Sequence, residues 1–396
     1  MKKILFVIPT MRMGGAERSL VSLLNALDPE RVAVDLLLFE AGGVLQKDIP
    51  EWVHIIEADP ITRGMTLELR KYLPELARKS IAAAVSRIWM SERAVFKRRL
   101  HLPPSFSWNT IKKYLPKLPG HYETAIGFLE GFTDFYVIDK VSADRKIGWI
   151  HTNMSARQYL SEEAQYYKIF DGIGVISEQC LHAFSSLYSE AGKRATVIPN
   201  VVLPDEVKRK ADEAGCAPWS EFGGDFHHLI TVGRLSEAKG IDVAIEVCYL
   251  LKERGLPVIW HVYGEGELRE QLEKQISEYN MEGTFILEGL TDNPYPYMKA
   301  ADVVVQPSRW EGKSLVLSEA KILGKAIVVT NYSSVRDQIQ DGQTGLVVGM
   351  EPGLIADAIE RVITDRDLRE TLENNCRKET GNYEENLNAF YRLIDA

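Results

Sequence analysis

Short apolar runs rich in β-branched residues alternate with segments of helical periodicity through the first half of the chain. Apolar runs occupy residues 4–10, 32–40, 52–58, 124–130, 146–152, 172–178 and 196–202. Between the first two, residues 14–27 place apolar side chains at the three- and four-residue spacing of a helix. Near-continuous apolar strands separated by helices are typical of a parallel sheet that is covered on both faces. We therefore predict an α/β domain here.

A second set of the same kind follows a polar stretch. Apolar runs at 229–235, 258–264, 284–290, 302–308 and 326–331 alternate with helical patterns at 241–255, 267–279 and 315–324. The intervening stretch contains Pro204, Pro218 and Gly223-Gly224 among many charges, which is typical of a linker. The pattern predicts two Rossmann-like, doubly wound domains, 1–203 and 226–383, joined by a linker at 204–225.

Ligands bind beyond the carboxyl ends of the strands in such sheets, so the loops after strands deserve most weight. Gly14 and Gly15 join the first strand to the first helix, where they would let an anion approach the backbone and the helix N-terminus. A tight strand-to-helix turn explains the pair equally well. His151 ends another strand and could donate to a phosphate or a sugar hydroxyl, or it could be purely structural.

Cations follow the first strand of the second domain. Arg234 comes directly after this strand, and Lys239 lies immediately before the glycine that opens the next helix. Two cations beside a helix N-terminus suit a diphosphate. Exposed Arg and Lys are more often simply solvated, and the position after a strand is what favours a binding role.

Two glutamates frame the start of a later helix. Glu311 lies in a loop after a strand, and Glu319 lies inside the helix predicted to begin near Ser314. Eight helical residues would separate their backbones by roughly 12 Å, which is longer than the roughly 5 to 9.5 Å between the paired carboxyl groups of most glycosidases. The spacing instead suits two acceptors that hold different hydroxyl groups of one extended ligand. By itself, a glutamate on a helix is usually solvated.

Other motifs are weaker. Gly264 and Gly266 follow a strand, but Arg269 occupies the third glycine position of a dinucleotide-binding GxGxxG motif. Asp365-Arg366-Asp367 is a DxD triplet between polar segments, so we interpret it as a helix boundary and expect no metal site there. No group of His and Cys has zinc-ligand spacing.

Composition fits an ordinary folded protein of 396 residues, 45% hydrophobic and 26% charged. The cysteines Cys180, Cys216, Cys248 and Cys376 are widely spaced, which favours free thiols in a reducing cytoplasm. Pro9 and Gly14-Gly15 interrupt the first apolar run, so we predict a buried strand there and no signal peptide. No apolar stretch reaches the roughly 18 to 20 residues that span a bilayer, so any membrane contact is expected to be peripheral.

Charge is distributed unevenly. Residues 63–117 contain thirteen Lys or Arg against three Glu, a net charge of +10 in a chain whose net charge is −9. This arrangement is unlike that of a general nucleic-acid binder. The basic residues alternate with aliphatic and aromatic ones, as they do in helices at an anionic membrane surface. An ordinary domain helix with a solvated charged face explains the segment equally well.

Together these motifs resemble the GT-B fold, retaining glycosyltransferase family 4, also called glycosyl transferases group 1. The shared order runs from GGAER through the strand-terminal histidine, GRL-x3-KG and YGEGELR to E-x7-E, and it covers nearly the whole chain. The segment WEGKSLVLSEAKILGKAIVVTNY is similar to bacterial members that build capsular, exopolysaccharide or cell-wall glycans. Many members have Gly-Phe-Gly after the first glutamate, whereas this chain has Gly312-Lys313-Ser314.

The resemblance implies two domains that face each other across a cleft, with a last helix, about residues 384–396, that packs back on the N-terminal, acceptor-binding domain. It implies a donor diphosphate at Arg234 and Lys239, and a ribose at Glu319. Further donor contacts would come from Gly14, Gly15, His151, Gly264, Glu311 and the amides around Gly312, Lys313, Ser314 and Leu315. His151, Arg234, Lys239 and Glu311 would be the catalytic residues.

The implied reaction moves a sugar from a nucleotide sugar, UDP-sugar being the simplest choice, to a glycan or lipid-linked acceptor. It would need no metal or other cofactor, because Arg234, Lys239 and a helix dipole stabilise the departing diphosphate. The expected location is the cytoplasm, or the inner face of the cell membrane. A UDP-sugar epimerase and a non-catalytic nucleotide-sugar-binding subunit of a transferase complex are the alternatives.

Overall fold

The computed structural model describes residues 1–100, 104–154, 161–213, 219, 226–379 and 383–396. Cys216 and most of the second half of the predicted linker lie outside these residues. The chain divides into two compact units, residues 1–201 with Glu384–Ala396, and Val202–Tyr383. The predicted alternation of strands and helices is confirmed in both units, each of which contains a parallel sheet.

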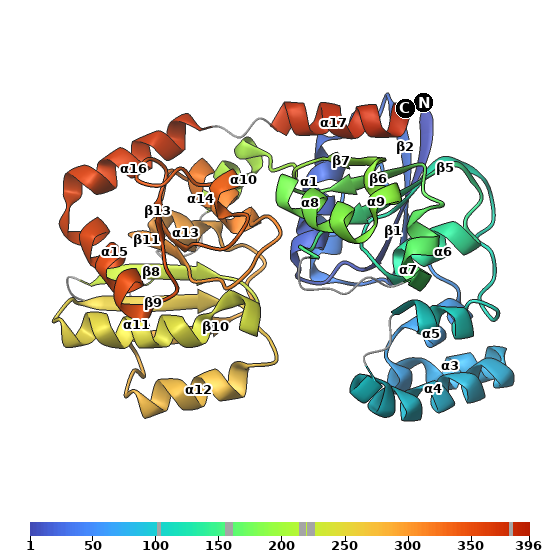
Figure 1. Cartoon of the computed structure of the whole chain (residues 1–396), viewed down its shortest axis with the longest axis horizontal. Coiled ribbons are helices and arrows are strands. Elements are labelled where there is room, and N and C mark those ends of the chain that lie inside the picture. Colours follow the sequence, from blue (N-terminus) through green and yellow to red (C-terminus); the bar gives the residue numbers. More distant parts are fainter. Residues whose placement is uncertain (101–103, 155–160, 214–218, 220–225, 380–382) are drawn as a thin grey trace. The chain divides into compact units, whose positions relative to one another are not determined.

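The N-terminal unit contains a sheet with strand order β3-β2-β1-β4-β5-β6-β7 (Figure 1). Its strands are β1 (Lys2–Thr10), β2 (Val32–Glu40), β3 (His54–Glu57), β4 (Tyr122–Gly127), β5 (Ala143–Ile150), β6 (Gly172–Val175) and β7 (Ala195–Val197). Its helices are α1 (Gly15–Ala26), η1 (Val44–Asp48), α2 (Pro60–Thr66), α3 (Leu69–Lys79), α4 (Ile81–Leu100), α5 (Pro104–Ile111), α6 (Phe132–Lys140), α7 (Ser161–Tyr167), α8 (Glu178–Leu187), α9 (Ser189–Gly192) and α17 (Tyr383–Asp395).

The order of strands reverses between β1 and β4, which pair in parallel with Phe6 opposite Ile126. This reversal is the topological switch point of a doubly wound sheet, beside which ligands bind. The central strands are apolar on both faces, since residues 4–8 are all fully buried. The first unit therefore presents a candidate site at the carboxyl ends of β1 and β4.

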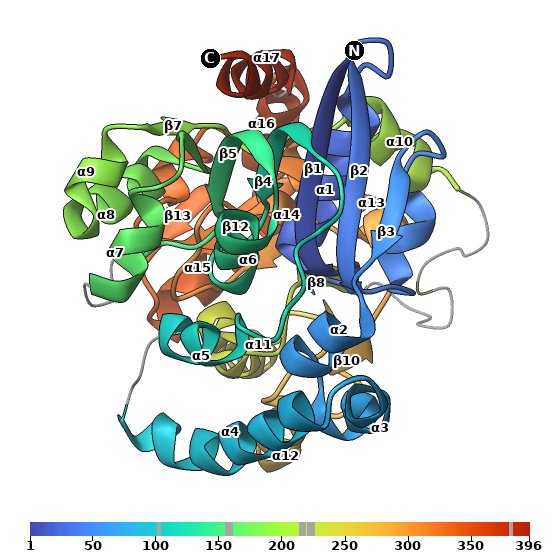
Figure 2. The ribbon, with the colours of Figure 1, turned by 90° about the vertical axis from the view of Figure 1, so that its right-hand side faces the viewer.

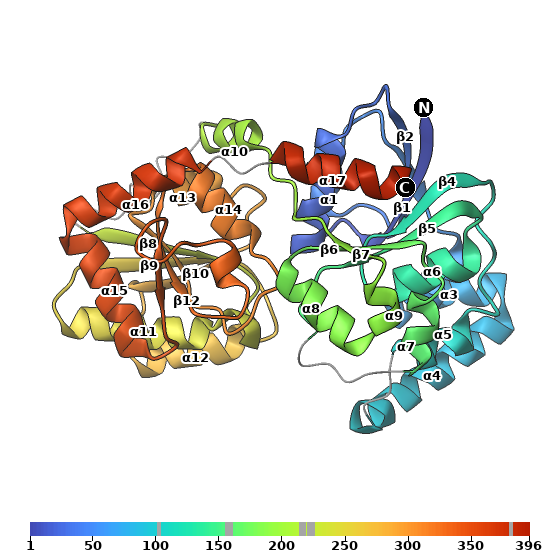
Figure 3. The ribbon, with the colours of Figure 1, turned by 45° about the horizontal axis from the view of Figure 1, so that its top comes forward.

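The last helix, α17, packs on one face of this sheet. The ring of Phe390 stacks on that of Phe6 in β1 at 6.0 Å between centroids, and it lies 6.1 Å from the ring of Trp149 in β5. The hydroxyl of Tyr391 accepts a hydrogen bond from the backbone N–H of Asp28, just after α1. Figure 3 shows α17 running across the N-terminal unit, with the C-terminus at its end. Although α17 ends the sequence, its apolar side chains are buried in the N-terminal unit.

The C-terminal unit contains a sheet with strand order β10-β9-β8-β11-β12-β13. Its strands are β8 (His227–Val232), β9 (Val258–Tyr263), β10 (Phe285–Gly289), β11 (Val303–Gln306), β12 (Ala326–Thr330) and β13 (Leu346–Val348). Its helices are α10 (Pro204–Ala211), η2 (Glu237–Lys239), α11 (Ile241–Glu253), α12 (Arg269–Glu278), α13 (Tyr295–Ala300), α14 (Leu315–Ile322), η3 (Val335–Asp337), α15 (Pro352–Thr364) and α16 (Arg366–Lys378).

Side chains of these strands alternate between two apolar cores. Val303 and Val305 of β11 join the core under α11 and α15, whereas Val304 joins the core under α13 and α14. Strands β8 and β11 pair in parallel, with Leu229 opposite Val303, and the strand order reverses between them. The switch point of this sheet therefore lies at the carboxyl ends of β8 and β11.

The predicted linker is partly helical. Residues 204–211 form α10, which packs against α13 and α14 and belongs to the C-terminal unit. The sequence supports a helix here, with Pro204 in its first turn, Asp205 and Glu206 after it, and basic residues in the last turn. The interpretation of Pro204 as a loop residue is wrong, because proline is well suited to the first turn of a helix.

Candidate functional site

The loops after β8 and β11 bring together residues that are far apart in the sequence. Lys239 follows β8 and Glu311 follows β11, and the Lys239 ammonium forms an ion pair with Oε1 of Glu311. Both side chains are mostly buried, with 21% and 14% of their surfaces exposed. The switch point therefore carries a cation and a carboxylate in direct contact.

Three donors converge on one oxygen of Glu311. In addition to Lys239, the Gln306 amide donates to Oε1 at 3.0 Å and the Ser308 hydroxyl donates at 2.8 Å. Within the described residues, Oε2 has no hydrogen-bond donor. The glutamate is thus held in one orientation by one oxygen, and the other oxygen is left to accept from a ligand hydroxyl.

Arg309 links the loop after β11 to the loop after β8 and to α11. The Arg309 guanidinium binds both carboxylate oxygens of Asp242 in α11, and it also donates to the backbone carbonyl of Glu237 at 2.9 Å. Burial alone would raise the pKa of Asp242, but hydrogen bonding and charge attraction from Arg309 lower it below its ordinary value. The loop that carries Glu311 is therefore fixed to the loop that carries Lys239.

Glycines allow the neighbouring backbones to approach closely. A Cβ at Gly264 would lie 1.8 Å from the carbonyl oxygen of Gly233, and one at Gly266 would lie 2.2 Å from that of Leu235. The backbone N–H of Leu235 also donates to the carbonyl of Glu265 at 3.0 Å. The loop after β9 thus supports the segment that contains Arg234, which gives Gly264 a structural role beside its predicted contact with the donor.

Arg234 itself is exposed. Within the part of the chain that the structure describes, its guanidinium makes no hydrogen bond or ion pair, in contrast to Arg309 and Lys239. An arginine presented by a rigid loop at a switch point keeps its planar array of donors available for an oxyanion.

The N-terminus of α14 faces the same loops. Ser314 precedes this helix, but its hydroxyl donates to Oε1 of Gln306 at 2.7 Å and does not cap the helix. Gln338 accepts from the backbone N–H of Ser314 at 2.8 Å and donates to its carbonyl at 2.7 Å, which fixes the turn. The amides of the first turn, beginning at Leu315, therefore lack a side-chain cap and suit an anionic ligand.

Glu319 lies one turn further along α14 and is 3% exposed. The hydroxyl of Tyr295 in α13 donates to its Oε1 at 2.9 Å. The alternative that Glu319 is an ordinary solvated helix residue is therefore wrong. Burying a carboxylate costs folding free energy, and the hydrogen bond from Tyr295 offsets part of that cost.

Two of the predicted residues of the N-terminal unit lie at its own switch point. Gly14 precedes α1 in an extended conformation and, within the described residues, supplies no side-chain cap to this helix. A Cβ at Gly15 would meet no atom within 4 Å, so packing does not require glycine there. A tight turn therefore does not account for Gly15, whereas a ligand that approaches the helix N-terminus would.

His151 follows β5 and is positioned by Glu130. The two oxygens of Glu130 accept from the His151 backbone N–H at 3.0 Å and from the Thr152 hydroxyl at 2.6 Å. Burial lowers the pKa of His151 to about 4, although the charge of Glu130 and a hydrogen bond to the Phe128 backbone oppose this shift. The imidazole is therefore neutral at pH 7. Its buried Nε2 has no hydrogen-bond partner among the described residues.

Several residues that shape the site were missed in the sequence. Gln306, Gln338, Tyr295 and Glu130 each hold a predicted residue in place. Glu130 could have been found, because it follows a strand in the run TAIGFLE just as His151 follows a strand. The others carry no spacing signal. Trp310, beside Glu311, was also missed and is 51% exposed.

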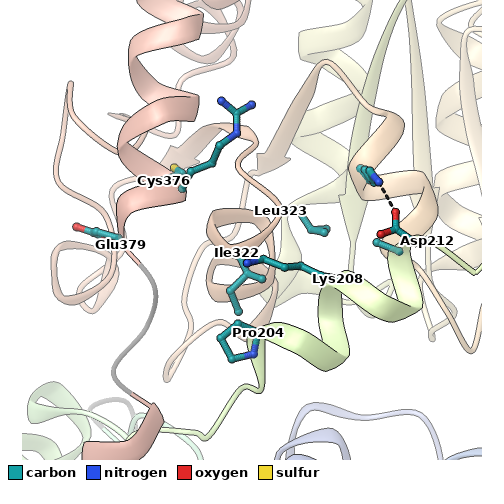
Figure 4. Close-up of a pocket in the computed structure, with 10 residues that line it drawn as sticks. Pro204, Lys208, Asp212, Ile322, Leu323, Cys376 and Glu379 are labelled. Atoms are coloured by element: carbon teal, nitrogen blue, oxygen red, sulfur yellow. Dashed lines mark hydrogen bonds and ion pairs between the residues drawn. The ribbon is translucent and has the colours of Figure 1, made fainter.

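A cavity of about 310 Å³ lies elsewhere in the C-terminal unit (Figure 4). It is lined by residues of α10 such as Lys208, by Ile322 and Leu323 at the end of α14, and by Cys376 and Glu379 near the end of α16. The end of α14 leads into the start of β12, so this cavity is at the edge where strands begin. It is thus distinct from the cluster around Glu311, which lies where strands end.

Asp365 accepts from the backbone N–H of Leu368 and caps α16, so its interpretation as a helix boundary is confirmed. Among the residues that the structure describes, no group of three or more His, Cys, Asp or Glu could hold a metal ion. No described helix is both long and apolar enough to cross a membrane.

Comparison with known proteins gives a family match for the C-terminal unit. Residues 220–379 match the family Glycosyl transferases group 1. The chain is 31% identical over 177 residues to an alpha-D-kanosaminyltransferase of Streptomyces kanamyceticus, covering 43% of this chain and 46% of that protein. It is 28% identical over 192 residues to the N-acetylgalactosamine-N,N'-diacetylbacillosaminyl-diphospho-undecaprenol 4-alpha-N-acetylgalactosaminyltransferase of Campylobacter jejuni, covering 48% and 50%. The chain spans about half the length of these relatives.

Solved structures extend the likeness to the whole chain. Anabaena HepE in complex with UDP-glucose superimposes with a TM-score of 0.69 at 16% identity, covering 100% of this chain and 99% of that one. Staphylococcus aureus TarM, in a complex that contains UDP, gives a TM-score of 0.67 at 15% identity, covering 100% of both chains. The chain therefore has the GT-B fold, and its residues 220–379 match the group 1 glycosyl transferases.

Proposed function

We propose that the protein is a glycosyltransferase that moves a sugar from a nucleotide diphosphate sugar to an acceptor hydroxyl, with retention at the anomeric carbon and without a metal ion. The observation that carries the proposal is the Lys239–Glu311 pair, which lies at a switch point between an exposed arginine and an uncapped helix N-terminus. The family match over residues 220–379 and the relatives named as glycosyltransferases support it.

The cations would hold the diphosphate. An ammonium group has three donors, so Lys239 can keep its bond to Glu311 and still donate to a phosphate oxygen. Arg234 would bind a second oxygen, and the α14 N-terminus, with the amides from Lys313 to Leu315, would add its positive end. These groups oppose the negative charge that develops on the departing diphosphate, which is electrostatic stabilisation of the transition state.

The two carboxylates, Glu311 and Glu319, would bind the remaining parts of the donor. Glu311 accepts from sugar hydroxyls through Oε2, because its other oxygen is already occupied. Glu319, buried on α14, accepts from the ribose. UDP is the nucleotide that we favour, because HepE and TarM were solved with UDP compounds.

The chemistry needs no protein nucleophile. The bond from the anomeric carbon to the diphosphate lengthens to give a short-lived, oxocarbenium-like ion pair, and the acceptor oxygen bonds to the same face. Its proton passes to the departing phosphate oxygen. Neutral His151 donates one ring N–H to the Phe128 backbone, so its other nitrogen, Nε2, would accept from a sugar hydroxyl. The N-terminus of α1 at Gly14 and Gly15 would contact the phosphate and the acceptor.

The acceptor is proposed to be a glycan or a lipid-linked glycan of the bacterial cell surface, and the site of action the cytoplasm or the inner face of the membrane. The Campylobacter relative is named for an undecaprenol-linked acceptor, which supports this choice. A panel of nucleotide sugars, screened for thermal stabilisation and then for hydrolysis or transfer, tests the proposal. Binding without any turnover would favour a non-catalytic subunit.

Chelation is a separate test of the mechanism. Activity is expected to persist in EDTA, because protein cations and a helix N-terminus already face the proposed phosphate position. Initial rates with and without EDTA, and after addition of Mg²⁺ or Mn²⁺, provide the measurement. Loss of activity in EDTA that either ion restores would contradict the metal-independent mechanism.

The two glutamates should have separable effects. Glu319→Gln is expected to weaken both the UDP-sugar and free UDP by about tenfold, on the scale of about 1.5 kcal/mol for a hydrogen bond to a charged group, because the ribose is common to both. Glu311→Gln should weaken the UDP-sugar by a similar factor and leave free UDP nearly unchanged. Calorimetric titration of each variant measures this. Equal losses of UDP affinity in the two variants would disprove the division of roles.

A further inference from the structure

Helix α4 exposes apolar side chains of the kind that an ordinary surface helix buries. Ile81, Val85, Ile88 and Trp89 are 75%, 61%, 40% and 49% exposed, and their spacing of four, three and one places them on one side of the helix. Ala83, Ala84 and Met90 are buried on the other side. Four large apolar side chains of the described part of α4 therefore point to solvent, whereas Met90 points to the protein.

A charged residue lies on the protein-facing side instead. The Arg87 guanidinium donates to the backbone carbonyl of Leu67 at 2.9 Å, and burial lowers its pKa below the ordinary value. A surface helix usually buries its apolar stripe and exposes its charges. The opposite arrangement means that α4 has an apolar surface available for another partner.

Part of the predicted basic surface is unavailable to a partner. Arg63 forms ion pairs with Glu57 and Glu75, and Lys71 with Glu40. Leu76 and Trp108 are buried in the unit, so neither contributes to a surface. The side chains of Phe96, Lys97, Arg98 and Arg99 lie outside the described residues.

Some cations remain next to the apolar stripe. Arg78 and Lys79, at the end of α3 and directly before α4, are exposed and make no ion pair or hydrogen bond among the described residues. An apolar stripe flanked by free cations complements an anionic lipid surface. It complements a second copy of the chain less well, because pairing two stripes would bring like charges together.

The location of this helix relates it to the candidate site. Lys71 and Tyr72 of α3 donate to Glu40 at the carboxyl end of β2, and Glu40 also pairs with Arg12 in the loop before Gly14. Figure 2 shows α3 and α4 beyond the ends of β1 and β2. Helix α4 is thus attached to the edge of the sheet where the proposed acceptor arrives.

We propose that Ile81, Val85, Ile88 and Trp89 insert into the interface of an anionic membrane, so that the N-terminal unit takes its acceptor at the lipid surface. The delivery of an acceptor at the membrane rests on the proposed function, whereas the insertion of α4 into the membrane does not. Insertion of apolar side chains, rather than charge alone, provides most of the attachment. Binding should therefore decrease with salt but not disappear.

Vesicle co-sedimentation of the full chain tests the proposal, with phosphatidylcholine alone and with 3:7 phosphatidylglycerol to phosphatidylcholine. The wild type should sediment with the anionic vesicles, and Val85→Asp/Ile88→Asp should reduce partitioning by at least about tenfold, since each removes inserted apolar surface and adds a negative charge. The matched control is Leu354→Asp, an exposed leucine of α15 at 48%, which should sediment like the wild type.

The fluorescence of Trp89 measures how deeply α4 inserts into the bilayer. Brominated lipid tails should quench part of the fluorescence of vesicle-bound wild type, and Trp89→Phe should abolish that part. Binding that the double aspartate variant retains, or no binding of the wild type at low salt, would overturn the proposal, as would a dimer that the same variant converts to a monomer. UDP titration of each variant shows separately whether the proposed donor site is intact.

Discussion

Replacing Lys239 with alanine is expected to lower kcat/KM by roughly 10² to 10³, or about 2.7–4 kcal/mol, the usual effect of removing one preorganised donor to a developing charge. Lys239 is oriented by Glu311, so its ammonium needs little rearrangement to meet a phosphate. Arg234→Ala should have an effect of the same order. Steady-state rates with the best donor of the panel provide the measurement.

The control for Lys239 is Lys274→Ala in α12, where the lysine is exposed and, among the described residues, pairs only with Glu278 four residues later. Such surface changes are usually worth less than about 0.5 kcal/mol, so its rate should match that of the wild type. The melting temperature of each variant separates a loss of folding from a loss of function. Unchanged kcat/KM in both Lys239→Ala and Arg234→Ala would remove these residues from the mechanism.

Gly264→Ala is expected to destabilise the C-terminal unit by about 1–3 kcal/mol, because the new Cβ would lie 1.8 Å from a backbone oxygen that cannot rotate away. Since that oxygen belongs to Gly233, relief of the clash must displace the segment that carries Arg234. UDP affinity should therefore fall as well. Chemical denaturation and calorimetric titration measure the two effects.

Gly353→Ala is the matched control. Gly353 lies in the first turn of α15, and a Cβ there would meet nothing within 4 Å. Alanine favours the helix, so this variant should be unchanged or more stable by up to about 1 kcal/mol, with normal UDP affinity. Equal stability of the two alanine variants would show that close approach at Gly264 does not hold the loop.

The strands and helices could be predicted because both sheets are parallel and buried. The strand 303–306 begins with three successive valines and is buried at every residue, and the intervening helices are long enough to show their period. Helix α10 was missed because its charges and proline also fit a linker. In the same way, composition identified residues 63–117 as basic, but it could not show that several cations are paired or that α4 presents its apolar side to solvent.

The individual residues of the site could be predicted from the sequence, but their arrangement in space could not. Arg234, Lys239 and Glu311 follow strands, which is visible in the sequence. Lys239 and Glu311 are 72 residues apart, however, and they meet only because β8 pairs with β11. Gln306 and Gln338 orient the site through hydrogen bonds that depend on tertiary packing, and no local pattern predicts them.

The binding of UDP most directly tests the central claim that the C-terminal unit holds a nucleoside diphosphate at Arg234 and Lys239. Calorimetric titration of the wild type should show binding in the absence of added metal. The double variant Arg234→Ala/Lys239→Ala, with the fold verified by its melting temperature, should bind at least about a hundredfold more weakly, since two charge-assisted hydrogen bonds are lost. Equal affinity of the folded double variant and the wild type, or no binding of any nucleoside diphosphate by the wild type, would contradict the account.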